Sequence, residues 1–177
     1  MKTLAIYILS KTFFLLKTLV FRSDISLYCG GILIPGQEWA IPVTMVDLSS
    51  PGDIDWEDTR PDLWLTEAAI EVSLGSASAI PLLNKKVTGY YRVTYDDDLW
   101  REMATILNTD HQSIHPYNRA QIICDTAHMS AHGHMDPSLA AEVTSWVQHT
   151  QEEFVVVRAL TECVHNLEKE ERRPRRG

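Results

Sequence analysis

The chain has 177 residues, of which 45% are hydrophobic and 23% charged, so it can bury a core and wholesale disorder is not expected. Its formal net charge of -8 argues against nucleic acid as a partner, because such partners are bound through basic surfaces. The basic residues at 169–177 form only a short tail around Pro174. Cys29, Cys124 and Cys163 match no metal-binding spacing and no disulfide framework, so three small hydrophobic residues are the favoured interpretation. A bridge between Cys124 and Cys163 stays open if their helices pack side by side in an oxidising compartment.

The first segment, residues 1–25, is apolar and begins with a basic residue, as a signal peptide does. Lys11 and Lys17 interrupt it, so it contains no clean apolar run long enough to span a bilayer. No small-residue cleavage site follows it. Three interpretations stay open: a degraded signal or anchor, an amphipathic interfacial segment, or sequence that is not native to the fold.

Residues 37–95 predict a small antiparallel β-sandwich, because short runs rich in β-branched and aromatic residues alternate with turns. The first strand is expected within 38–47, with Pro42 indicating a sheet edge. Residues 84–89 are expected to form a hairpin loop that leads into the last strand. The further runs lie at 62–66, 68–74, 79–84 and 89–95.

After Asp96 the apolar residues recur at the spacing of an α-helix, and residues 96–168 predict four helices. Asp96 to Asp98 cap the first helix, the second covers 117–132 and stops at Gly133, and Asp136 with Pro137 opens the third. The fourth is expected over 152–168. The predicted buried faces are Leu99, Trp100, Met103, Ile106 and Leu107; Leu139, Ala140, Val143, Trp146 and Val147; and Phe154, Val157, Leu160 and Cys163.

The loops between these helices are short, so successive helices should pack as antiparallel hairpins, the start of an α-solenoid. The predicted fold class is therefore α+β in two parts: a small antiparallel β-sandwich followed by α-helical hairpins. An array cut after four helices would leave an apolar face without its neighbour, so self-association of the isolated chain is expected.

The string at 85–100, KKVTGYYRVTYDDDLW, resembles the signature of the aminopeptidase N family at the junction between its β-sandwich and its helical domain. The matching residues are Gly89, Tyr90, Tyr91, Arg92, Val93, Tyr95, Asp96 and Trp100. Four further stretches are similar in the same order: WAIPVT at 39–44, WL at 64–65, IHPYNRAQII at 114–123 and HGHMDPSLAAEVTSWV at 132–147. Their common order makes the resemblance specific.

The resemblance implies a part of a zinc aminopeptidase that lies outside its catalytic domain. The family cuts peptides with a His-Glu-x-x-His helix, a distant glutamate ligand, a Gly-x-Met-Glu-Asn loop and a tyrosine. Neither a His-Glu pair nor a Gly-x-Met-Glu-Asn string occurs in the sequence. The expectation is a fragment or truncated paralogue, inactive alone, with no catalytic residue, zinc ligand or cofactor of its own.

The resemblance also implies partners and a location. The catalytic domain of an aminopeptidase and its peptides are the expected partners, and the expected location is extracellular or at the plasma membrane. The alternative function is an inactive peptide- or protein-binding module that pairs with a full-length aminopeptidase.

Three clusters are candidate sites. His128 and His132 have the spacing of helical metal ligands, and His134 follows beyond the expected helix end. Met129 stands where a zinc peptidase has its base, so solvated histidines at a helix end are favoured. The second cluster is acidic and consists of Asp53, Asp55, Glu57 and Asp58. It lacks the glycine and glutamate of a calcium loop and predicts a solvated turn. The third cluster lies on the tyrosine-rich strand and predicts a structural junction; it consists of Tyr90, Tyr91, Arg92 and Tyr95.

Overall fold

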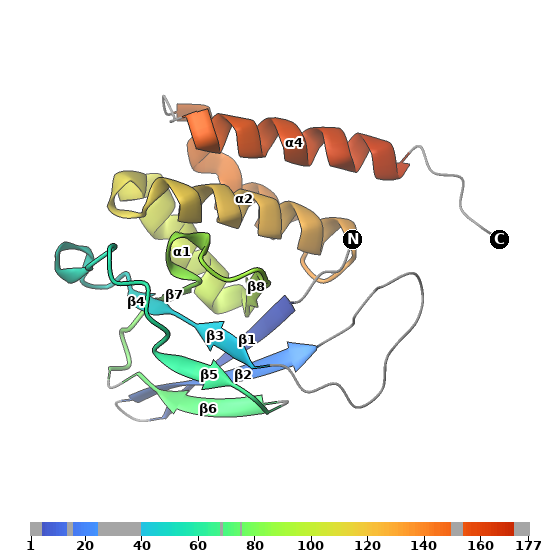
Figure 1. The fold of residues 1–177 in the computed structure, drawn as a ribbon. Helices are drawn as coiled ribbons and strands as arrows, with labels where there is room; N and C mark the ends of the chain where they lie inside the picture. Colours follow the sequence, from blue (N-terminus) through green and yellow to red (C-terminus); the bar gives the residue numbers. More distant parts are fainter. Residues whose placement is uncertain are drawn as a thin grey trace.

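The computed structural model describes residues 5–13, 16–24, 40–67, 69–74, 76–149 and 154–171. It is an α+β structure with small sheets on one side and helices stacked on the other (Figure 1). Helix α2 lies between the strands and α4, so it contacts both parts of the molecule. The general class therefore agrees with the prediction.

The strands form one four-stranded sheet and two small ones. The large sheet has the order β6-β2-β1-β8, and only the β1–β8 pair in it is parallel. The small sheets are the antiparallel pairs β3–β5 and β4–β7. The bounds are β1 Ala5–Phe13, β2 Leu16–Asp24, β3 Ile41–Val43, β4 Met45–Asp47, β5 Leu63–Leu65, β6 Ala69–Ser73, β7 Pro81–Leu83 and β8 Arg92–Tyr95.

The N-terminal segment contributes the two central strands of the large sheet, which none of its three sequence interpretations includes. Strand β1 pairs with β8, so that Ile8 lies opposite Tyr95, and β2 pairs with β6, so that Phe21 lies opposite Ile70. The partners lie far along the chain, and a local apolar pattern does not identify such long-range pairing.

Two local predictions in the β part are wrong. The run at 38–47 is split at Thr44 into β3 and β4, which belong to different sheets. The hairpin at 84–89 is not formed, because β7 pairs with β4 while β8 pairs with β1. The segment is instead a 3-10 turn over Lys85–Val87 that redirects the chain from one sheet to another.

The helices are α1 Asp97–Asp110, α2 Pro116–Ala131, α3 Pro137–Thr144 and α4 Phe154–Glu171, with further 3-10 turns at Pro51–Asp53, His111–Ser113 and Ser145–His149. The predicted caps at Asp96 and Asp136 are confirmed: their carboxylates accept bonds from Leu99 N at 2.9 Å and Ser138 N at 2.7 Å. Within the described residues, no helix has the length and hydropathy of a membrane span.

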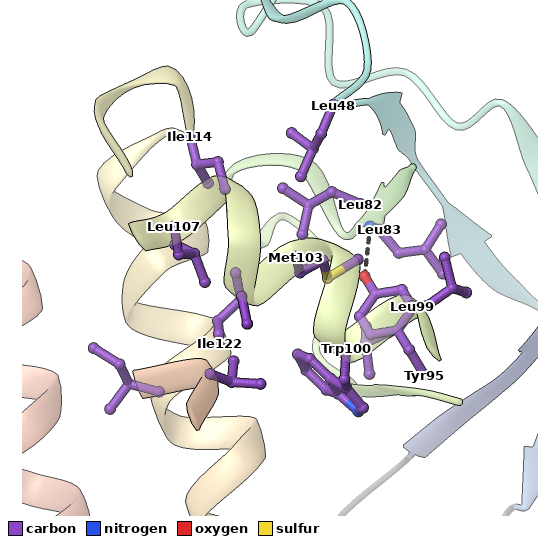
Figure 2. Packing of buried hydrophobic residues seen from close by; sticks show 14 of the residues in the cluster. Leu48, Leu82, Leu83, Tyr95, Leu99, Trp100, Met103, Leu107, Ile114 and Ile122 are labelled. Carbon is purple, nitrogen blue, oxygen red and sulfur yellow. Dashed lines mark hydrogen bonds between the residues drawn. The ribbon is translucent and has the colours of Figure 1, made fainter. Parts of the chain in front are cut away.

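The core is shared by the β part and the helices (Figure 2). Leu99, Trp100 and Met103 of α1 are buried against β7 and β8, as the helical period predicts. The Tyr95 hydroxyl accepts a hydrogen bond from Leu83 N at 2.9 Å, and its ring meets Trp100 edge-on at 4.9 Å. Because one core serves both parts, neither can lose its packing without exposing the other.

The predicted buried face of α4 is wrong for two residues. Phe154 is 77% exposed and Val157 48% exposed, whereas Val156 is fully buried and Ala159 is 8% exposed. Helix α4 packs along α2 through the Val156 face, which is rotated from the stripe that starts at Phe154. The side chain of Cys163 lies outside the described residues, so a bridge to Cys124 stays a prediction.

Adjacent valines on α4 test this orientation. Val156→Ala removes two methyl groups from a buried position and should lower the free energy of unfolding by about 2 kcal/mol. Val157→Ala changes a half-exposed side chain and should alter it by less than about 0.5 kcal/mol. Urea unfolding followed by circular dichroism gives both values, and equal losses would show that the assigned face is wrong.

Candidate functional site

The most strongly polar part of the interior lies where β8 and the turn before it meet α2. The prediction that β8 joins two parts of the fold is confirmed by its contacts. Arg92 binds α2, the Thr94 hydroxyl lies 3.4 Å from Trp100 Nε1 on α1, and Tyr95 binds β7. Tyr91 and Val93 are buried with Tyr95 on the same face of the strand.

Asp125 is the buried carboxylate at this junction. It lies within α2 and accepts a hydrogen bond from Arg92 Nη1 at 2.9 Å and another from Val93 N at 2.9 Å. Arg92 Nη1 also donates to the Cys124 carbonyl at 3.3 Å. Burial raises the pKa of Asp125 to about 6, although the bond from Val93 and the charge of Arg92 oppose this rise.

Asn84 organises the turn that precedes β8. Its backbone is left-handed, with φ of 60°, and its side chain is fully buried. Asn84 Oδ1 accepts a bond from Gly89 N at 2.7 Å, and Nδ2 donates to the Gly89 carbonyl at 3.0 Å. One amide therefore closes the turn on itself. A methyl group at Gly89 would overlap the Tyr91 ring, so glycine is required at that position.

Asn118 of α2 holds this turn from the other side. Its Nδ2 donates to the Asn84 carbonyl at 3.0 Å, and its Oδ1 accepts from Lys86 N at 2.8 Å. The Thr44 hydroxyl accepts from Lys85 N at 2.8 Å, and the Thr44 carbonyl accepts from Asn84 N at 2.9 Å. Buried side-chain amides with satisfied bonds specify one relative position of the elements they join.

The turn also contains backbone strain. Lys86 and Val87 have φ values of 52° and 57°, next to Asn84 at 60°. Asparagine tolerates the left-handed region, but a β-branched valine there is a genuine outlier. The bonds from Asn118 and Thr44 compensate this strain. Backbone strain of this kind persists only where the surrounding structure holds the segment in place.

The arrangement fixes geometry and offers little chemistry. Arg92, Asp125, Asn84 and Asn118 direct their polar atoms at the backbone or at one another. The buried Tyr95 phenol has a raised pKa because burial disfavours the phenolate, so it stays protonated. These residue types act here as connectors between secondary-structure elements.

The histidine cluster lies at the end of α2, away from this junction turn. The rings of His128 and His132 lie 4.1 Å apart between centroids, at 34° to each other. Burial lowers the pKa of His128 to about 4, with contributions from Arg92, His132 and His134. Met129, between the rings in sequence, is buried in the core. Within the described ranges, no group of three or more His, Cys, Asp or Glu side chains is placed to hold a metal.

The acidic cluster is divided among separate partners. Asp55 Oδ1 accepts from Glu57 N at 2.9 Å, and Glu57 pairs with Lys86 at 2.9 Å. Asp58 receives both Arg60 Nε at 2.9 Å and Nη2 at 2.7 Å, and these bonds lower its pKa. The carboxylates therefore serve a loop, as the sequence predicts, and the Asp58 carbonyl accepts a bond from Lys85 Nζ at 2.6 Å.

The polar residues that make the junction were not among the candidate sites predicted from the sequence: Thr44, Asn84, Asn118 and Asp125. A signal for Asp125 and Asn118 exists, because they interrupt α2 with buried polar residues among Ile122, Ile123 and Met129. The absence of catalytic residues stays a prediction, since these contacts do not test it.

Comparison with known proteins agrees with the architecture. The ERAP1-like C-terminal domain family matches residues 81–172, just over half of the chain, and this range holds the junction turn, β8 and all four helices. The chain belongs to the ERAP1-like C-terminal domain family.

Individual relatives are aminopeptidases. The chain is 40% identical over 114 residues to aminopeptidase N of Plutella xylostella. These aligned residues make up 62% of the chain and 12% of that protein. It is 40% identical over 99 residues to aminopeptidase N of Homo sapiens, covering 53% of the chain and 9% of that protein. Membrane alanyl aminopeptidase of Heliothis virescens is 28% identical over 133 residues, covering 74% of the chain and 13% of that protein. The chain thus spans about a tenth of the length of these relatives.

A valine substitution tests the strain in the junction turn. Val87→Gly should raise the free energy of unfolding by about 1 kcal/mol, because glycine adopts positive φ without a steric penalty. Val87→Ala keeps a Cβ and should not show this gain. Thermal unfolding of the three proteins gives the result, and a loss of stability in Val87→Gly would contradict the strain.

Two substitutions of Asp125 test the buried ion pair. Asp125→Ala leaves Arg92 and Val93 N without their acceptor and should cost about 3 kcal/mol of unfolding free energy. Asp125→Asn keeps the shape but only one acceptor oxygen, so one of the two donors faces its NH2 group, and it should cost about 2 kcal/mol. Urea unfolding at neutral pH measures both, and an Asp125→Ala protein as stable as the parent would refute the role assigned to the pair.

Proposed function

We propose that this chain is a non-catalytic segment of a zinc-dependent aminopeptidase, a fragment or truncated paralogue, and that it acts as structural support for the catalytic part. Its β part would be a small β-sandwich, and its helices would be the first hairpins of an α-solenoid. Membership of the ERAP1-like C-terminal domain family and the similarity to several aminopeptidases support this proposal.

One observation carries the supporting role. Helix α2 binds the backbone of β8 and of the 84–89 turn through Asp125 and Asn118, both of them buried. Backbone-directed bonds of this kind hold elements in position whatever side chains vary around them. In a longer protein, such a junction would transmit the position of the β part to the helices rigidly.

Catalysis is assigned to another part of the parent enzyme. Neither a His-Glu pair nor a Gly-x-Met-Glu-Asn string occurs in this sequence, so the catalytic zinc and the peptide amine would be held elsewhere. The expected partners are the catalytic domain and, through it, peptides. An extracellular or membrane-associated location follows from the same relationship and is part of the proposal.

The test has two parts. The purified chain, incubated with aminoacyl-anilide substrates and zinc, should release no more product than buffer; zinc-dependent release would refute the assignment. Native-state hydrogen exchange should show that amides of β8 and α2 open together at one free energy. In the Asn118→Ala variant, the opening free energies of the β8 amides and the α2 amides should differ. If the two elements open independently in the unsubstituted chain, the supporting role is refuted.

An interaction module that pairs with a full-length aminopeptidase is the second candidate. The outward face of α4 favours it, because Phe154 is 77% exposed and Val157 48% exposed on one side of the helix. A pull-down with a full-length aminopeptidase tests it. If the chain recovers the aminopeptidase and a Phe154→Ser/Val157→Ser double variant does not, the result supports pairing. If the chain recovers neither the enzyme nor any peptide, pairing is refuted.

A further inference from the structure

We propose that His128 and His132 form a binding site for one divalent late transition-metal ion at the C-terminal end of α2, separate from any catalytic zinc. The two residues are four apart, so they project from the same side of the helix. Their ring centroids are 4.1 Å apart. Two imidazoles held this close on one helical turn can reach a single ion by small side-chain rotations, while water completes the coordination.

The hydrogen bond of His132 leaves one of its nitrogens available as a ligand. His132 Nδ1 lies 2.8 Å from the His128 carbonyl oxygen. A carbonyl only accepts, so Nδ1 must carry the proton in that contact, and Nε2 then has the free lone pair. A metal-bound histidine is commonly oriented in this way, with its second nitrogen donating to a backbone carbonyl. The His132 side chain is exposed, so an ion can reach it from solvent.

The end of the helix and the net charge of the chain favour a cation. The site lies in the last turn of a helix, Pro116–Ala131, whose C-terminal carbonyls carry partial negative charge. Arg92 and His134 also act electrostatically on His128 and oppose positive charge there, and Arg92 is paired with Asp125 at 2.9 Å. The net charge of -8 also raises the local concentration of cations around the protein.

The fold makes the last turn of α2 a defined platform. His132 N donates to the His128 carbonyl at 3.2 Å, and Gly133, with φ of 74°, ends the helix. His134 N donates back to the Met129 carbonyl at 2.8 Å, which completes the terminal motif. A bound ion would link His128, in the last turn of α2, to His132 at the end of the helix. Binding to the folded chain would then stabilise the connection between α2 and α3.

Two imidazoles and water bind copper most strongly among the divalent first-row metals, so Cu²⁺ is the probe. Titration of the full chain should show a one-to-one site with a rise in melting temperature that EDTA reverses. The electron paramagnetic resonance spectrum should show two equatorial nitrogens. His132→Gln and His128→Gln should each weaken the affinity more than about tenfold, because each removes a direct ligand.

Two controls separate this site from the other histidines. His134→Gln should change the Cu²⁺ affinity far less than either ligand variant, because position 134 lies beyond the helix end, although His134 acts on His128 electrostatically. The double variant Ser130→His/His132→Gln keeps seven histidines but places one two residues from His128, where the rings face apart, and should bind as weakly as His132→Gln. Circular dichroism confirms that α2 is retained. The assignment would be overturned if substitution of His128 and His132 did not change the Cu²⁺ affinity, or if substitution of His134 reduced it equally. The histidines would then be solvated side chains at a helix end.

Discussion

The carboxylate of Asp125 lies in the interior between α2 and β8, where Arg92 Nη1 and Val93 N donate to it at 2.9 Å each. A buried carboxylate is costly unless its oxygens are paired, so its position requires that the strand and the helix keep one register. The core around Tyr95 and Trp100 can pack only when that register is kept. Strand β8 in turn pairs with β1, so the constraint extends into the large sheet.

The junction turn shows how polar bonds and strain are balanced in the same place. Val87 and Lys86 hold unfavourable left-handed backbone, while Asn84, Asn118 and Thr44 satisfy the polar groups around them. The turn sends the chain from β7, in one small sheet, to β8 in the large sheet. A regular hairpin would pair these strands with each other, whereas here β7 pairs with β4 and β8 pairs with β1. The strain is thus the cost of joining sheets and helices into one body, which suits a supporting segment.

The helical part was largely predictable because its signals are local. Asp96 and Asp136 mark helix starts by accepting bonds from residues two or three positions away, and Pro137 does so by its fixed φ. Helix α1 shows its buried face in its period. The junction was less accessible. Asn118 and Asp125 stand out as polar residues in a buried helix, but their partners at 84–93 lie more than thirty positions earlier. The histidine pair was visible as a spacing, although the hydrogen bond that selects the tautomer of His132 depends on the helix end.

The amino-acid sequence was sufficient for the α+β class, the four helices with the caps at Asp96 and Asp136 and the stop at Gly133, and the resemblance to aminopeptidases, because these depend on short-range patterns and ordered motifs. Tertiary contacts settled the remaining features. The strands at 5–13 and 16–24 take their partners from β8 and β6, and α4 buries Val156 and not Phe154 because α2 meets that side. Strand pairing and helix rotation follow from which distant surface is available to bury apolar groups and satisfy backbone bonds, and a local pattern does not contain that information.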